Sequence, residues 1–232
     1  MKIEVLFPEI CNLFGDLYNI NYLEKCLPEV QRVHTPLTGQ PLFLTEEPAL
    51  VYLGPMSERS QEKVLEKLRP CRDRLAELIQ NGAAFLLTGN AGEVFGSYIE
   101  NEDGSRIEGL GLLPLHARRD MMHRHNSVFL GEFQGAEAMG FKSQFTMAWP
   151  EAGAQGLFPV KKGVGLNPQC PYEGLRQGNL FFTYLLGPVL LLNPQLAEAL
   201  LAAMGAGGTP LALAPEMAEA YQARLRDFHE KV

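Results

Sequence analysis

The chain has 232 residues, of which 46% are hydrophobic and 20% are charged, and its formal net charge is −7. This size and composition are typical of one large soluble α/β domain with a sizeable core. The negative charge argues against non-specific binding to nucleic acid and against binding to an anionic membrane surface.

Cysteine usage and hydropathy both favour a cytoplasmic protein. The longest apolar run, from Leu180 to Leu192, is interrupted by Gly187 and Pro188 and is too short to span a bilayer. The first residues contain no signal-peptide pattern. The four cysteines are widely spaced without a Cys-x-x-Cys pair, which fits a reducing compartment better than a disulfide framework or a zinc site. They are Cys11, Cys26, Cys71 and Cys170.

The first part of the chain alternates predicted strands with predicted helices. Strands are expected at Lys2 to Phe7, at Val30 to Val33 on a sheet edge, and at Ala49 to Leu53. Asp16 is a suitable N-cap for the first helix, and Ser57 for a long amphipathic helix from about Glu58 to Gln80. Such alternation indicates a mostly parallel, doubly wound sheet.

The later part changes character. Short segments of mixed polarity with many glycines predict antiparallel strands, followed by one more buried strand and two helices. The expected strands are Met121 to Phe133, Phe141 to Trp149 and Asn179 to Leu185, and the expected helices run from Asn193-Pro194 to Met204 and from about Ala214 to Val232. We therefore expect residues 1–232 to form a single flavodoxin-like domain, with helices on both faces of the sheet and an added antiparallel region.

One strand–turn–helix stands where α/β enzymes place a nucleophile. An apolar strand begins at Ala84, breaks at Gly89 and resumes as a helix. A sharp turn of this kind lifts one side chain above the sheet, next to backbone N–H groups that stabilise an oxyanion. Gly89 occupies the apex, between Thr88 and Asn90, so this turn carries no nucleophile.

Seven segments in order resemble the cobyric-acid-synthase-type glutamine amidotransferases. The closest branch is the glutaminase subunit of lipid II isoglutaminyl synthase, which partners a Mur-ligase-like subunit. The resemblance extends to about Leu200 and implies the amidotransferase fold and a ligase partner. The matching segments are Pro8 to Asp16 with Asn19-Ile20, Gly54 to Gln61, the turn around Gly89, Gly109 to Leu113, Gly140-Phe141, Glu173-Gly174 and Thr183 to Pro188.

The departures from this resemblance fall where the chemistry should be. Gly89 stands at the position of the family's catalytic Cys, and Leu186 at that of its general-base His. Neither side chain can attack an amide or move a proton. Pro55 and Met56 replace two glycines of the loop that supplies oxyanion N–H groups, and Gln144 replaces another His. The resemblance therefore implies that no catalytic residue is intact.

The family's remaining pocket positions imply a set of binding residues. The position of the family's elbow Gln is held by Glu93. The implied binding residues are Gly54, Arg59, Gln61, Asn90, Glu93 and Gln144. The resemblance also makes Asn12 and Asp16 candidates for contact with a pocket or a partner, although both residue types favour caps and turns. Leu186 should point into the former active-site cleft.

Other chemistry-bearing residues have ordinary explanations beside functional ones. Cys170 and Thr88 are candidate replacement nucleophiles, while Cys11 is expected in the core. His123 and His125 would share one face of a strand, but with His116 they lack a recognisable carboxylate partner, so we expect surface histidines and neither metal nor cofactor. Five basic residues are candidates for an anionic pocket or for solvated strand ends: Arg118, Arg119, Arg124, Lys161 and Lys162.

Two hypotheses of different classes follow. The first is a glutaminase-dead amidotransferase homologue that serves as a non-catalytic subunit of a Mur-ligase-like or other ATP-dependent ligase, with or without a bound small amide or amino acid. The second is a working amidotransferase or amide hydrolase that uses an unrecognised nucleophile, with Cys170 and one of the middle histidines as the proposed arrangement.

Overall fold

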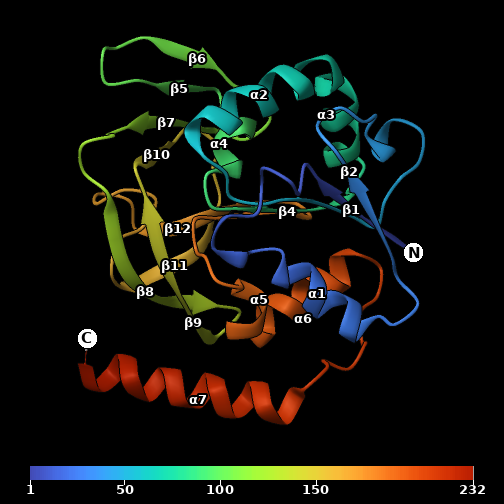
Figure 1. Cartoon of the computed structure of the whole chain (residues 1–232). Helices are drawn as coiled ribbons and strands as arrows, with labels where there is room; N and C mark the ends of the chain where they lie inside the picture. The colour runs from blue at the N-terminus through green and yellow to red at the C-terminus, as the bar shows by residue number, and fades with distance from the viewer. Residues whose placement is uncertain (232) are drawn as a thin grey trace.

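The computed structural model describes residues 1–231 and contains one large sheet, one small sheet and flanking helices (Figure 1). The nine-stranded sheet has the order β2-β1-β3-β4-β13-β12-β11-β8-β9, and the four-stranded sheet has the order β10-β7-β5-β6. The strands are β1 (Lys2–Leu6), β2 (Gln31–Thr35), β3 (Leu50–Leu53), β4 (Ala84–Thr88), β5 (Tyr98–Glu100), β6 (Arg106–Glu108), β7 (Leu115–Arg119), β8 (His125–Phe133), β9 (Ala136–Gln144), β10 (Thr146–Pro150), β11 (Gly156–Lys162), β12 (Tyr172–Gln177) and β13 (Leu180–Thr183).

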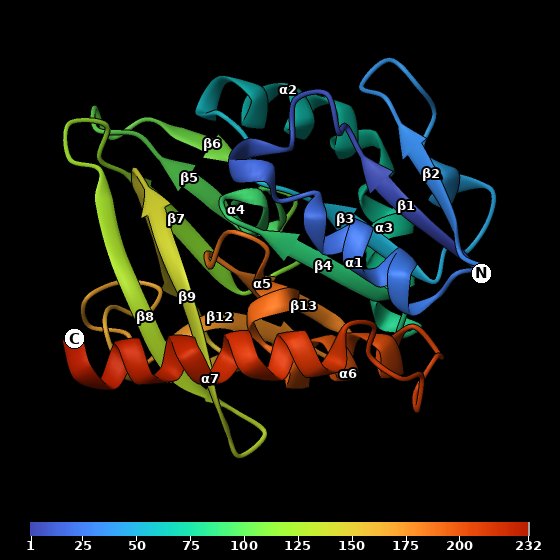
Figure 2. The same cartoon turned by 60° about the horizontal axis from the view of Figure 1, so that its bottom comes forward.

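Helices cover both faces of the parallel half of the large sheet, as expected (Figure 1). One face carries α2, α3 and α4, and the other carries α1, α5 and α6, while α7 crosses the hairpin of β8 and β9 (Figure 2). The helices are α1 (Tyr18–Cys26), α2 (Glu58–Leu68), α3 (Arg72–Gln80), α4 (Ala91–Phe95), α5 (Val189–Leu192), α6 (Pro194–Ala203) and α7 (Ala214–Lys231), with short 3₁₀ turns η1 (Leu13–Gly15), η2 (Leu42–Leu44) and η3 (Arg69–Cys71).

Strand direction changes at β13. This strand pairs in parallel with β4 and antiparallel with β12, and every pairing from β12 outward to β9 is antiparallel. The predicted α/β fold with an added antiparallel region is therefore confirmed, although the parallel and antiparallel parts contribute equally to the large sheet, which is mixed and not mostly parallel. Since β4 and β13 are central strands, the turns that follow them lie side by side at one edge of the parallel half.

Two apolar layers hold the sheet between its helices. Val64, Leu65 and Leu68 of α2 pack with Leu53 and Leu87 on one face. The core of the other face includes β-strand side chains together with residues of α1, α5 and α6. A small separate cluster, made of Leu130, Met139, Tyr221 and Phe228, attaches α7. In residues 1–231, no helix combines the length and the apolar character needed to cross a bilayer.

Several predicted boundaries were wrong for identifiable reasons. The predicted helix from Glu58 to Gln80 is two helices joined by η3, because Pro70 lies in its interior and cannot donate a backbone hydrogen bond. Met121 to Phe133 is a strand only from His125, and the segment from Phe141 to Trp149 is divided between β9 and β10 in different sheets. The predicted end of the last helix at Val232 lies outside the described residues.

The two predicted helix caps have different outcomes. The Ser57 hydroxyl accepts a hydrogen bond from the Ser60 backbone N–H, which confirms Ser57 as the N-cap of α2. Asp16 does not cap α1, which begins after Leu17 without a side-chain cap. The Asp16 carboxylate is instead fully buried among polar partners, and these partners place it behind the candidate site.

Candidate functional site

The turn after β4 keeps the backbone shape of a nucleophile elbow without the nucleophile. Strand β4 is buried along its whole length, and α4 begins two residues after Gly89. Gly89 has a φ of +58°, a left-handed conformation that strains residues with a side chain. The strained geometry that lifts a nucleophile above the sheet in α/β enzymes is therefore present around a glycine.

The space above Gly89 is filled by its neighbours. A β-carbon on Gly89 would lie 2.5 Å from Cβ of Pro55 and 3.3 Å from Cδ2 of Leu186. Because real Cβ atoms do not approach another carbon as closely as 2.5 Å, no side chain fits here unless the Pro55 loop moves. Leu186 lines the cavity beside this turn, and its backbone N–H donates to the Phe141 carbonyl over 2.9 Å.

The loop opposite the elbow has little capacity to stabilise an oxyanion. Pro55 has no N–H, and the N–H of Met56 donates to Oδ1 of Asn90 over 3.0 Å. The Asn90 amide in turn donates to the Met56 carbonyl over 2.9 Å. Gly54 is required for close packing, since a β-carbon there would lie 2.5 Å from the Cys11 carbonyl oxygen. Asn90 therefore fixes the loop and satisfies the Met56 amide.

Asp16 connects the elements that converge behind the elbow. Its carboxylate accepts hydrogen bonds from the hydroxyls of Tyr52 on β3 and Thr88 on β4, and from the N–H of Gly187. Burial raises the pKa of Asp16, and the bonds from Thr88 and Tyr52 partly oppose that shift. Thr88 is fully buried, with its hydroxyl bound to Asp16. It therefore lies away from any position where it could meet a substrate.

A second buried carboxylate, that of Glu93, comes from α4 itself. Glu93 accepts hydrogen bonds from Nε2 of Gln61 and from the Tyr184 hydroxyl, each over 2.8 Å. Oε1 of Gln61 accepts from Arg119 over 2.9 Å. Burial raises the pKa of Glu93 to about 7, while the bonds from Gln61 and Tyr184 oppose the shift. This network joins α2, α4, β7 and the segment after β13.

A buried lysine and glutamate occupy the far side of Tyr184. Lys142 is fully buried, and its ammonium donates to the Gly165 carbonyl and lies 6.0 Å from the Tyr184 ring centroid. Glu173 accepts from the Thr183 hydroxyl over 2.6 Å and from the Tyr184 N–H over 2.8 Å. Burial lowers the pKa of Lys142 and raises that of Glu173, while their mutual attraction opposes both shifts.

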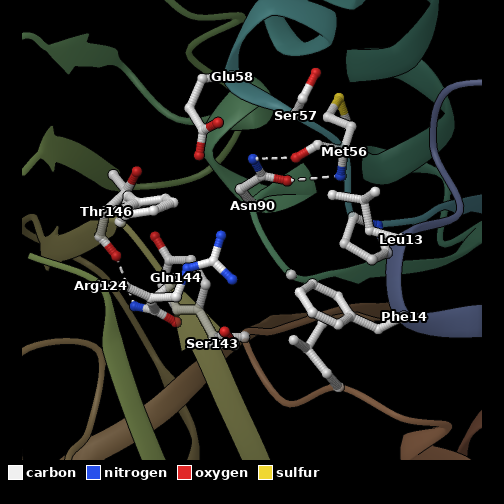
Figure 3. A pocket seen from close by; sticks show the side chains of 15 residues that line it. Leu13, Phe14, Met56, Ser57, Glu58, Asn90, Arg124, Ser143, Gln144 and Thr146 are labelled. Atoms are coloured by element: carbon white, nitrogen blue, oxygen red, sulfur yellow. Dashed lines mark hydrogen bonds between the residues drawn. The ribbon is translucent and has the colours of Figure 1, made fainter. Parts of the chain in front are cut away.

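An open cavity of about 150 Å³ lies beside the turn at Gly89 (Figure 3). Figure 3 shows Glu58, Arg124 and Gln144 on one side and Leu13 and Phe14 on the other. The cleft is therefore narrowed by Leu186 and Met56 but not closed, while Phe95 is fully buried in the core. Its lining comprises Leu13, Phe14, Pro55, Met56, Ser57, Glu58, Gly89, Asn90, Arg124, Ser143, Gln144, Phe145, Thr146, Tyr184 and Leu186.

The structure separates the residues implied as binding residues. Asn90 and Gln144 line the cavity, whereas Gln61 and Glu93 are buried behind it and Gly54 supports the loop. Arg59 is exposed on α2 and does not line the cavity. The residues that sequence reasoning did not single out there are Glu58, Ser143 and the exposed pair Leu13 and Phe14. Leu13, Phe14 and Glu58 lie within matched motifs and Ser143 closely follows one, which was the available signal.

Cys170 and the histidines lie in separate settings. Cys170 is a free, buried thiol that does not line the cavity. His116 pairs with Glu151 over 3.2 Å, and His123 pairs with Asp120 over 2.9 Å, so carboxylate partners exist for both. His123 precedes β8, and the prediction that it shares a strand face with His125 was wrong. Among residues 1–231, no three His, Cys, Asp or Glu side chains gather to hold a metal ion.

The five candidate basic residues do not converge on one pocket. Arg124 lines the cavity, with its guanidinium 4.4 Å from the Phe145 ring centroid. Arg118 lies over Trp149, and Arg119 is bound in the Gln61 network. Lys161 pairs with Glu132 and Glu137 at the β8–β9 hairpin, and Lys162 is exposed on β11. Arg124 is the member of this set that a cavity ligand would meet.

Two sequence relatives of the chain are the same subunit of the same enzyme from two bacteria. No protein-family model matches the chain. The chain is 25% identical over 192 residues to the GatD subunit of lipid II isoglutaminyl synthase (glutamine-hydrolyzing) of Staphylococcus aureus, covering 82% of this chain and 78% of the relative. It is 24% identical over 209 residues to the same subunit of Streptococcus pneumoniae, covering 86% and 78%.

Solved structures agree on the fold. A glutamine amidotransferase crystal structure aligns with a TM-score of 0.58 and 14% identity, covering 87% of this chain and 98% of that one. A second, from Thermotoga maritima, aligns with a TM-score of 0.53 and 12% identity, covering 100% and 86%. The chain therefore has the fold of glutamine amidotransferases, and its sequence is similar to that of the GatD subunit of lipid II isoglutaminyl synthase.

Proposed function

We propose that this protein is a cobyric-acid-synthase-type amidotransferase homologue that has lost glutaminase activity. It serves as a non-catalytic subunit of an ATP-dependent ligase, of the Mur-ligase type, in lipid II amidation. The similarity to GatD supports the amidotransferase and cell-wall setting. The observation that carries the loss of activity is the filled space above Gly89. Pro55 and Leu186 occupy the position that a side chain on residue 89 would need.

Amide hydrolysis through a covalent intermediate needs a nucleophile, a base and an oxyanion site. Gly89 supplies no nucleophile, Leu186 supplies no base, and the Met56 amide is already bonded to Asn90. Cys170 lies outside the cavity with no histidine among the hydrogen bonds or ion pairs of residues 1–231 that involve it. Three independent deficits at one site support a subunit that does not hydrolyse glutamine.

The test is ammonia release from glutamine, measured for the purified chain and for the chain with its co-purifying ligase. The S. aureus GatD relative, with its ligase, provides the positive control. We expect release at the level of a protein-free blank in both preparations. Release above that level would refute the proposal, and its loss in Cys170→Ser would then assign the reaction to the alternative nucleophile.

A gain-of-function series sharpens this test. Gly89→Cys with Leu186→His restores two residue types but leaves Pro55 against the new Cβ. We expect this pair to stay inactive. Adding Pro55→Gly removes the Pro55 side chain that meets the new Cβ and tests whether the fold still supports chemistry. Robust hydrolysis by the double variant alone would show that the Pro55 loop presents no obstacle.

A further inference from the structure

The cavity contains polar groups that the folded chain leaves without partners. In residues 1–231, the Glu58 carboxylate and the Arg124 guanidinium form no ion pair, although Arg124 stacks on Phe145. Oε1 of Gln144 also has no hydrogen-bond partner, but this atom is buried within the protein and is not open to the cavity. Glu58 and Arg124 are an acceptor and a donor of opposite charge, so together they fit a ligand that supplies both a donor and an acceptor.

The chemistry of this side matches an ammonium and a carboxylate. A guanidinium fork binds a carboxylate through two parallel hydrogen bonds. The Glu58 carboxylate is an acceptor, and an ammonium offers it up to three donors. Figure 3 shows Glu58 and Arg124 pointing into the same space from different segments. Their charges are opposite, which suits a zwitterion better than a simple anion or cation.

The other side of the cavity is apolar. Leu13 and Phe14 line it from η1, next to Pro55, whose carbonyl accepts from the Leu13 N–H over 3.1 Å. Pro55 in turn packs with Leu186 around Gly89. This contiguous apolar wall replaces the elbow chemistry, and the Met56 N–H beside it is bonded to Asn90. An amide placed against this wall would lose its hydrogen bonds to water without replacement.

Phe14 adds an independent sign of function. Its φ is +61°, an uncommon conformation for a residue with a bulky side chain, and its side chain is 52% exposed at the cavity. Strained backbone that holds an aromatic ring toward solvent is retained where the ring has a use. A ring at the cavity wall offers contact to an apolar ligand group.

We infer that this cavity binds a free α-amino acid with a small apolar side chain, such as leucine, and discriminates against glutamine. The inference rests on the proposed loss of glutaminase activity, because it assigns the same site to a ligand that is held and not hydrolysed. The Arg124 guanidinium binds the α-carboxylate, Glu58 binds the α-ammonium, and the side chain lies on Leu13, Phe14 and Leu186. A cavity of roughly 150 Å³ is large enough for a six-carbon body.

Isothermal titration of the full chain with L-leucine, L-glutamine, leucinamide and N-acetyl-leucine tests this assignment. We expect saturable leucine binding with a Kd of about 1 mM or tighter, and glutamine binding about 10- to 100-fold weaker, because its amide would be buried without partners. Leucinamide lacks the carboxylate and N-acetyl-leucine lacks the ammonium, so both should bind more weakly than leucine by about tenfold or more.

Matched variants locate the site. Arg124→Gln and Glu58→Gln should each weaken leucine binding by about tenfold or more. Arg176→Gln, which also removes an arginine stacked on a phenylalanine but lies outside this cavity, should leave it unchanged, as should Glu66→Gln on α2. Circular dichroism checks that each variant is folded, and both tested side chains are at the surface of the cavity.

The outcomes separate this inference from the proposed function. Absence of saturable leucine binding, or equal binding in Arg124→Gln, refutes the amino-acid site while a lack of ammonia release still supports a non-catalytic subunit. Glutamine that binds as tightly as leucine without hydrolysis refutes the apolar specificity. Glutamine that releases ammonia refutes the proposed function itself.

Discussion

Replacing Glu93 by glutamine should make the protein more stable at high pH and leave its stability little changed at low pH. The Glu93 carboxyl has a pKa of about 7 in the folded protein, against an ordinary value of 4.5. Since the folded state holds this proton more tightly than the unfolded state, stability falls as pH rises from about 4.5 to 7. Below about pH 4.5 the Glu93 carboxyl is protonated in both the folded and the unfolded state, so it does not change the free energy of unfolding.

The size of the effect follows from the shift. At about 1.36 kcal/mol for each pKa unit, the charged carboxylate destabilises the folded protein by about 3 kcal/mol above pH 7. Glutamine has the same shape and no charge. Its carbonyl can accept from Gln61, and its amide can donate to the Tyr184 hydroxyl, which also accepts hydrogen bonds. The variant therefore keeps both contacts.

The assay is urea denaturation of the wild type and of Glu93→Gln at pH 5 and pH 8. Other buried titratable groups, among them Asp16, Glu173 and Lys142, are present in both proteins and cancel in the difference. The stability advantage of the variant should grow by roughly 2–3 kcal/mol between the two pH values. Glu66→Gln on the surface of α2 should show no such growth. An advantage that is independent of pH would refute the reasoning.

Three further predictions concern the elbow, Asp16 and α7. Gly89→Ala should destabilise the fold by about 2–4 kcal/mol, because it combines a φ of +58° with a Cβ contact of 2.5 Å to Pro55, and a double-mutant cycle with Pro55→Gly should recover part of that loss in urea denaturation. If the stability losses of the two single variants simply add in the double variant, the strain does not come from the contact between Pro55 and the new Cβ. Asp16→Ala should cost about 1–3 kcal/mol, because it leaves the buried hydroxyls of Tyr52 and Thr88 without their acceptor, whereas Asp103→Ala on an exposed turn should cost less in the same assay. Tyr221→Phe removes the hydrogen bond to the Glu137 carbonyl, and hydrogen exchange should then quicken in α7 while β1, β3 and β4 keep their protection. Uniform quickening would mean that α7 opens only with the whole fold.

Local chemistry made the alternating elements and their caps predictable. The apolar runs at β3 and β4 and the serine before α2 need no distant partner to be recognised. The break at Pro70 was also visible in the sequence, and it was missed because the amphipathic period continues on both sides of it. The spacing of apolar residues shows which face of a helix is buried, but it does not show that one helix ends and another begins in a new direction.

The residues of the candidate site could be predicted only where they belong to a motif whose place in the fold is known from the resemblance. Gly89, Leu186, Asn90 and Gln144 all come from matched motifs, and all four line one cavity. Asp16 was misread as a cap because its partners, Tyr52 and Thr88, lie on other strands far along the chain. Glu58 was also missed, since only the packing of α2 against the elbow brings its carboxylate to the cavity. Long-range partners of this kind cannot be read from spacing.

The change of strand direction at β13 also sets an order for folding. Strands β8 and β9 are joined by a tight turn at Gln134 and Gly135, both with positive φ, so their pairing closes a very short loop. Pairing of β4 with β13 joins Phe85 to Leu180 and must wait for the whole intervening segment. We therefore expect the hairpin to form early and the β4–β13 seam to close last. The cavity lies at that seam, so a nascent chain acquires this cavity only when folding is nearly complete.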